Sequence, residues 1–193
     1  MIKLIVKILS RENYLLKILA KKTGLNMDNI LDFDLFLYAT EKGDLVGIDQ
    51  EFISAPKIDN LASVYTGITG LIEATNEDHI NVFVGFDNEE IGSATKQGAD
   101  SNYLLNILER IYKSLNYDRN AFLQSLHNSF LLSSDGAHAA HPAHVEKSDP
   151  TNRVKLNEGI AVKISANQKY TSDGYSIGVI KQLLEGTNIK MQT

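Results

Sequence analysis

A β-branched apolar run at residues 80–86 lies between two stretches whose apolar side chains repeat with helical spacing, residues 60–74 and residues 104–115. The run has the length and composition of a buried strand, and turn-forming residues bound it on both sides. Each flanking stretch has one apolar face, as a helix packed on a sheet does. This alternation predicts the α/β fold class, with a sheet covered on its faces.

Further elements are expected from the same periodicities. An amphipathic helical stretch, packed on the rest of the protein, is expected within the first 25 residues. The other predicted elements are helices over residues 13–22, 120–130 and 172–184, and strands over residues 33–38 and 160–164.

Local signals mark where several of these elements begin, end or meet a neighbour. Gly24 is a good helix terminator, because glycine adopts the left-handed conformation that ends many helices. Ser172 is the expected cap of the last helix, and Asp100 or Ser101 the expected cap of the helix over 104–115. In addition, Gly67 and Gly70 would allow another element to approach residues 60–74 closely. Gly186 is the expected end of the last helix.

Composition restricts the classes of function. The chain has 193 residues, 19 Lys plus Arg, 24 Asp plus Glu and a net charge of -5, so no basic surface favours a nucleic-acid partner. Lysines interrupt the apolar runs of the first 25 residues, which argues against a membrane span and against a targeting segment. We therefore expect a cytoplasmic protein. The absence of cysteine leaves His, Asp and Glu as the possible metal ligands.

A first polar cluster, SAPKIDNLAS, covers residues 54–63. Its Asp59 stands where a helix is expected to begin, and an aspartate there often accepts hydrogen bonds from the first free backbone amides. Helix capping and metal ligation are both open for Asp59 on this evidence.

A second cluster, FDNEEIGS, follows the predicted strand over 80–86 directly. Its three acidic residues, Asp87, Glu89 and Glu90, lie within four positions, where mutual repulsion favours a bound cation. A solvated turn is the alternative. The strand end before a Gly-Ser pair would hold a site rigidly.

A third cluster, SSDGAHAAHPAH, covers residues 133–144 and holds three of the five histidines. Imidazole and carboxylate groups are zinc ligands, and the small residues between them leave room for a substrate. A surface loop rich in histidine is the alternative, since His-x-x-His alone is a weak motif.

The order and the amino-acid sequences of the three clusters, with EKSDP at residues 146–150, resemble those of the aspartyl aminopeptidase family of dinuclear zinc metallopeptidases. The resemblance extends from about Asn13 to Met191. It implies a three-layer α/β catalytic domain of which residues 49–193 are the central part. Residues 1–48 would be the trailing part of an inserted dimerisation domain, with the boundary near Asp49-Gln50.

The resemblance also implies roles for single residues. Asp59 would bridge two Zn²⁺ ions, Glu90 would bind one ion and Asp135 the other, with Mn or Co as possible replacements. Glu89 would be the general base, acting on the water that the two ions hold.

Two further residues acquire substrate roles from the resemblance. His138 would lie close to the substrate carbonyl or the metal ions, and Lys163 would face the acidic side chain of an N-terminal Asp or Glu. The partners implied are peptides with such N-terminal residues and further copies of the chain, since the family builds a large assembly from dimers.

The family's metal site also includes two histidines, one near the start of the catalytic domain and one near its end. No histidine precedes Asp59 and none follows His144. We therefore expect the chain to begin after the first of these ligands and to stop before the second. Each ion would keep two carboxylates and bind weakly.

Three functions remain open. The first is a metal-dependent aminopeptidase represented by an incomplete chain. The second is a truncated homologue without catalysis, which retains a structural or oligomer-forming role. In the third, His138, His141, His144 or another chain supplies the missing imidazole.

Overall fold

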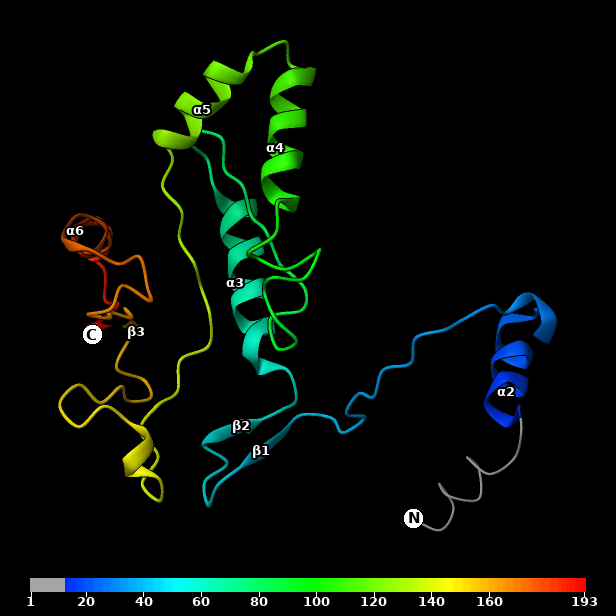
Figure 1. Cartoon of the computed structure of the whole chain (residues 1–193). Helices are drawn as coiled ribbons and strands as arrows, with labels where there is room; N and C mark the ends of the chain where they lie inside the picture. The colour runs from blue at the N-terminus through cyan, green and yellow to red at the C-terminus, as the bar shows by residue number, and fades with distance from the viewer. Residues whose placement is uncertain (1–12) are drawn as a thin grey trace. The chain divides into compact units, whose positions relative to one another are not determined.

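The computed structural model describes residues 13–193, which fall into two units, one ending at Ser54 and the other covering Ala55–Thr193. Each unit is described by itself, and Figure 1 traces the order of the elements. Residues 1–12 of the amphipathic stretch expected in the first 25 residues lie outside the described residues. The first unit contains the helix α2 (Tyr14–Thr23), the short 3-10 helix η1 (Met27–Asn29) and the strands β1 (Asp44–Val46) and β2 (Phe52–Ser54).

Helix α2 confirms the helix predicted over 13–22. It ends at Gly24, whose φ of 73° is left-handed and whose N–H donates to the carbonyl of Ala20. Lys21 and Lys22 occupy the last turn, where positive charge interacts favourably with the helix dipole. A local signal in the sequence was therefore sufficient to place this end.

The strand predicted over 33–38 is wrong. The described residues form no ladder there, and the first unit instead pairs β1 with β2 in antiparallel register, Leu45 opposite Ile53. An alternating apolar pattern becomes a strand only when a neighbour supplies hydrogen-bond partners. The predicted boundary near Asp49-Gln50 lies in the turn of this hairpin. The assignment of the two portions to an inserted domain and a catalytic domain stays a prediction.

The second unit contains four α-helices among the described residues, and these confirm the helices predicted at 60–74, 104–115, 120–130 and 172–184 in type and approximate place. They are α3 (Ile58–Glu73), α4 (Tyr103–Ser114), α5 (Arg119–His127) and α6 (Gly174–Leu184), with the 3-10 helix η2 (Val145–Lys147) and the strands β3 (Ile160–Ala161) and β4 (Met191–Gln192).

Helices α4, α5 and α6 begin at residues of the expected capping types, but the N-caps of α4 and α6 each lie one residue beyond the predicted positions. Asp118 caps α5, accepting from the N–H of Ala121 at 2.8 Å. The last helix is capped by Asp173 rather than by Ser172, and Asp173 forms a reciprocal capping box with Ser176. At α4 the N-cap is Asn102, without a side-chain bond, in place of the predicted Asp100 or Ser101. Two adjacent residues with similar capping ability cannot be separated by sequence alone.

The run at 80–86 is also unpaired within the described residues, although its sequence is that of a buried strand. It packs on α3 instead. A Cβ on Gly67 would lie 2.5 Å from the Phe83 ring, so Gly67 permits the close approach that was predicted. Gly70 has no heavy atom within 4 Å of such a Cβ, and the same prediction is wrong there.

The strand predicted over 160–164 is paired only at Ile160–Ala161, in parallel with Met191–Gln192. Helix α6 connects the two strands, and this β3–α6–β4 order is the parallel unit typical of α/β proteins. Among the described residues, no helix is long and apolar enough to cross a membrane.

The apolar packing that can be identified centres on Phe122 of α5. It is 4% exposed, and its ring lies 5.4 Å from that of Tyr112 on α4. Tyr112 in turn lies 5.7 Å from Tyr117 in the connecting turn. Among residues 13–193, Phe122 is the one buried large apolar side chain, while Leu37 and Ile48 are fully exposed.

Truncation of Phe122 should therefore be costly. We expect Phe122→Ala to lower the free energy of unfolding of the α4–α5 pair by about 3 kcal/mol, because it removes a ring and leaves a cavity. Urea unfolding followed by tyrosine fluorescence measures this. Leu123→Ala is the matched control, since Leu123 is 49% exposed and should change the value by less than about 1 kcal/mol. Equal effects of the two substitutions would contradict the role of Phe122.

The start of α6 should respond to acid. The backbone N–H of Ser176, followed by its hydroxyl, holds the pKa of Asp173 below its ordinary value of 3.8. The cap therefore stabilises the helix above the ordinary pKa and is lost as pH falls through the lowered one. Backbone chemical shifts of Ser176 and Ile177 between about pH 5 and about pH 2 should show the first turn fraying. Asp173→Asn keeps an acceptor without a charge, and should abolish that pH dependence.

Candidate active site

The loop at 133–136 lies against the beginning of α3. The side-chain amide of Asn60 donates to the carbonyl oxygen of Ser134 at 3.2 Å. A Cβ on Gly136 would lie 2.8 Å from Oδ1 of Asp59 and 2.9 Å from its Cγ, so the loop backbone touches this carboxylate. The first and third sequence clusters, far apart along the chain, are thus neighbours in space.

Asp59 does not act as a helix cap. Lys57 takes the N-cap position of α3, and the backbone at Asp59 and Asn60 is not helical, so the regular helix starts only after them. The peptide bond between Asp59 and Asn60 is cis. No hydrogen bond or ion pair to the Asp59 carboxylate is found within residues 13–193. This exposed carboxylate is therefore available to a ligand, whereas the capping alternative is not supported.

Asp135 is paired with Lys163, two positions beyond β3. The Nζ–Oδ2 distance is 3.4 Å, and the two side chains are 45% and 36% exposed, respectively. The same ammonium lies 5.8 Å from the centre of the Tyr170 ring. A pair this exposed contributes less than about 1 kcal/mol, so it orients Lys163 without fixing it.

Glu89 and Glu90 lie in a turn after the run at 80–86. Asn88 has a left-handed φ of 64°. Its backbone N–H donates to Oδ1 of Asp87, and its side-chain amide donates to the hydroxyl of Thr95 at 3.3 Å. The N–H of Gly92 closes the turn on the carbonyl of Asn88 at 2.7 Å. In the part of the chain that the structure describes, neither glutamate side chain forms a hydrogen bond or an ion pair.

The histidines of the third cluster separate into two groups. His141 and His144 have ring centres 5.3 Å apart, and His144 Nδ1 lies 3.3 Å from Oε1 of Glu146. His138, by contrast, has no hydrogen bond or ion pair within the described range. The loop that follows is ordered by Asp149, whose Oδ1 accepts from Asn152 N and from Thr151 N at 2.8 Å each. These bonds, led by that from Asn152, lower the pKa of Asp149.

The described residues, as placed, do not fit a metal ion. Nowhere in residues 13–193 do three or more His, Asp or Glu side chains come together in a way that could hold one. Asp59 and Asp135 belong to adjoining segments, but Glu90 does not join them, within the described residues, in a group that could hold an ion. A catalytic zinc commonly has three protein ligands.

Sequence reasoning missed two residues that shape this site, Asn60 and Gly136. Both lie inside the quoted clusters, next to the residues to which roles were given. Their signal was present in the residue types: an amide can tie one loop to another, and glycine permits a close approach. Their partners, however, could be named only from the structure.

Gly136 should be intolerant of a side chain. We expect Gly136→Ala to displace the Asp59 carboxylate and weaken the Asn60–Ser134 bond, since the new methyl group would overlap Oδ1. The carboxyl-carbon shift of Asp59 and the side-chain amide shifts of Asn60 report this by NMR. Gly70→Ala is the control, because it meets no atom within 4 Å and should stabilise α3 by about 0.5–1 kcal/mol. Unchanged shifts in Gly136→Ala would contradict the contact.

Comparison with known proteins gives the context of this site. The family model described as "Aminopeptidase I zinc metalloprotease (M18)" matches residues 7–193. A probable M18 family aminopeptidase 2 of Clostridium acetobutylicum is 51% identical over 182 residues, covering 94% of this chain and 42% of the relative. The aspartyl aminopeptidase of Aspergillus oryzae is 38% identical, covering 88% of this chain and 37% of that protein. The chain therefore spans about two fifths of the length of these relatives.

Solved structures agree on the fold. The cryo-EM structure of the Ape4 and Nbr1 complex matches 92% of this chain and 36% of the other, with a TM-score of 0.79 and 35% identity. The crystal structure of yeast aminopeptidase 1 matches 93% of this chain and 42% of its own, with a TM-score of 0.74 and 28% identity. The predicted α/β class and the predicted resemblance are both confirmed. The chain belongs to the M18 family of zinc metalloproteases.

Proposed function

We propose that the chain is part of a metal-dependent aminopeptidase that removes N-terminal residues from peptides, preferring acidic ones. The observation that carries the proposal is the Asn60–Ser134 bond, which joins the Asp59 and Asp135 segments across 74 positions of sequence. Family membership supports the peptidase class. The name of the Aspergillus relative supports the acidic preference.

The proposal assigns the proton transfer to Glu89, as the general base that takes a proton from the attacking water. Asp59, Glu90 and Asp135 are the proposed metal ligands. Lys163 is the proposed partner of an acidic substrate side chain. Its contact with the carboxylate of Asp135 supports this assignment, since the same ammonium can bind a second carboxylate that comes within reach.

His138 completes the proposed substrate contacts, beside the carbonyl of the bond that is cleaved. Its side chain makes no hydrogen bond or ion pair with the rest of residues 13–193, so a ring N–H is open to donate to a substrate oxygen. The support for this role is its place in the loop that touches Asp59.

The proposal includes a zinc requirement, with two ions in the complete site and Mn²⁺ or Co²⁺ as possible replacements. The family's description as zinc metalloproteases supports zinc. Because the described residues gather fewer than three ligands at any one point, we expect weak binding by this chain alone.

The proposed partners are peptides with N-terminal Asp or Glu and further copies of the chain. Exposed apolar side chains support association, since large apolar groups on a surface favour burial against a partner. Leu31, Leu37 and Ile48 are 95%, 104% and 100% exposed, respectively. A cytoplasmic location is part of the same proposal.

A second candidate function is structural: a homologue without catalysis that contributes a fold and an association surface. It is favoured by the lack of any three-ligand metal group in residues 13–193. The two candidates differ in one measurable respect, which is turnover in the presence of added metal.

Turnover by the purified 193-residue chain tests the proposal directly. At Zn²⁺ or Mn²⁺ concentrations high enough to offset the weak binding expected of this chain, we expect hydrolysis of an aspartyl or glutamyl amide, and a loss of about 10²–10⁴-fold in kcat for Glu89→Gln, the usual contribution of a general base. Glu73→Gln, at the end of α3, is the matched control and should keep full activity.

Each outcome decides between the candidates. Turnover that falls in Glu89→Gln and survives in Glu73→Gln supports the peptidase and its base. Equal turnover in both variants would show that Glu89 is not the base. No turnover with either metal would overturn catalysis by this chain and favour the structural role.

A further inference from the structure

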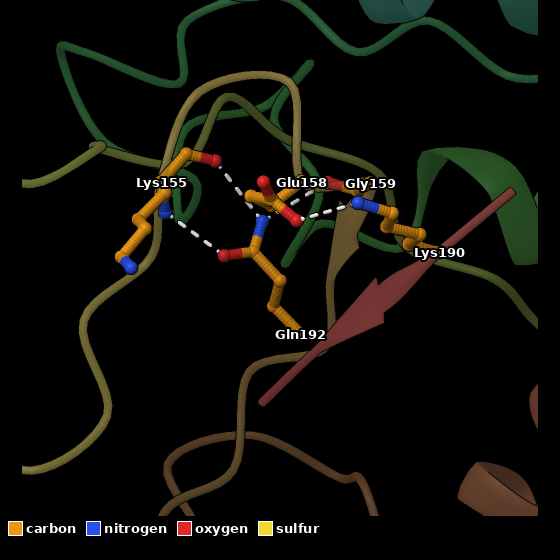
Figure 2. A network of polar contacts seen from close by, with 5 residues as sticks. All are labelled: Lys155, Glu158, Gly159, Lys190 and Gln192. Carbon is orange, nitrogen blue, oxygen red and sulfur yellow. Dashed lines mark hydrogen bonds and ion pairs between the residues drawn. The ribbon is translucent and has the colours of Figure 1, made fainter.

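Gln192 in β4 has a side-chain amide with every polar group engaged (Figure 2). Its Oε1 accepts from the backbone N–H of Lys155 at 2.9 Å. Its Nε2 donates to the carbonyl of Lys155 at 3.1 Å and to that of Gly159 at 3.3 Å. A single side chain therefore holds both ends of the 155–159 turn, across more than thirty positions of sequence.

The turn itself fits closely against β4. Gly159 has a left-handed φ of 92°, and a Cβ there would lie 1.9 Å from the carbonyl oxygen of Lys190. Glu158 forms an ion pair with Lys190, with Oε2 and Nζ 2.9 Å apart. This pair is exposed, so we attribute the position of the turn chiefly to the amide of Gln192 and to the close approach at Gly159.

Backbone hydrogen bonds directly after this turn set the register of the chain that leads to the candidate site. Ile160 N–H donates to the carbonyl of Lys190 at 3.0 Å, and Val162 N–H donates to the carbonyl of Gln192 at 2.9 Å. Lys163 is the next residue. Its backbone thus leaves β3 at a position set by the pairing with the β4 backbone and by the turn that the Gln192 side chain holds, and its ammonium reaches Asp135 from there.

We infer that Gln192 is a positioning residue that holds the 155–159 turn and β3 in the register that directs Lys163 toward Asp135. The contacts of Gln192 support its positioning role. The consequence for binding of an acidic substrate side chain by Lys163 rests on the proposed function. Gln192 itself touches neither Lys163 Nζ nor Asp135.

The chemistry of the position explains why glutamine is required. Two carbonyl oxygens and one N–H converge on it, so its partner must supply two donor hydrogens and one acceptor, as a primary amide does. Glutamate retains the acceptor, but its charge would face two carbonyl oxygens. Leucine has nearly the same shape and no polar group, and would leave all three backbone groups without this partner.

The experiment measures the Lys163–Asp135 contact directly, without turnover. A water-soluble carbodiimide couples a lysine amine to a carboxylate only where the two lie in contact, and peptide mass spectrometry quantifies the product. We expect coupling of Lys163 to Asp135 in the unmodified chain, and about a fivefold decrease in Gln192→Leu, which corresponds to the loss of roughly one net hydrogen bond. Gln124→Leu, on the exposed surface of α5, is the matched control.

A second variant and a second product separate positioning from a general loss of folding. Gln192→Glu should give a smaller decrease than Gln192→Leu, because it keeps the acceptor for Lys155 N–H. The helical circular-dichroism signal reports whether the fold persists, whereas coupling of Lys190 to Glu158 reports whether the 155–159 turn itself has moved. If Gln192→Leu loses that signal, Gln192→Glu alone decides the matter.

Unchanged Lys163–Asp135 coupling in a folded Gln192 variant would overturn the positioning role, whatever its effect on stability. A selective decrease in this product, with the helical signal and the Gln124→Leu control unchanged, supports it. Because the readout needs no catalysis, a failure of the proposed aminopeptidase activity is distinguishable from a failure of this inference.

Discussion

The candidate site depends on the close approach of the 133–136 loop to the beginning of α3. One hydrogen bond, from the Asn60 amide to the Ser134 carbonyl, and one backbone contact, from Gly136 to Asp59, hold these segments together. The approach is possible because Gly136 has no Cβ to meet the carboxylate. Without it, Asp59 and Asp135 would belong to unrelated elements, and the pairing of Asp135 with Lys163 would have no place in a common site.

Polar contacts carry much of this arrangement, since the described apolar core is small. Phe122 and the two tyrosine rings near it form a local cluster between α4 and α5. The segments that bear Asp135 and Lys163 are instead tied through backbone groups, at Gln192 and at Asp149. Exposed ion pairs contribute little to stability, whereas a side chain that satisfies several backbone groups specifies one local geometry.

The sequence of the run at 80–86 is suited to a paired strand buried on both faces, and the described residues provide neither the pairing nor the burial. Its β-branched composition is that of a strand buried on both faces, but it has no ladder, and Ile80 is 75% exposed. The predicted metal ligands show the same mismatch, because Glu90 follows this run and does not form a three-ligand group with Asp59 and Asp135 within residues 13–193. Both observations concern the run at 80–86 and the turn that follows it. A neighbouring strand paired with this run would define its position relative to the rest of the site.

The sequence by itself determined the helices, their approximate ends and the family. Gly24 acts within one turn of its own position, so its effect follows from local chemistry. The motifs around Asp59, Glu89 and Asp135 are specific enough to identify the family without coordinates. Only the tertiary structure decided which strands pair and that Lys163, Gly136 and Gln192 contact the partners they do. These contacts join residues distant in sequence, and their geometry depends on how the whole chain packs rather than on any local preference.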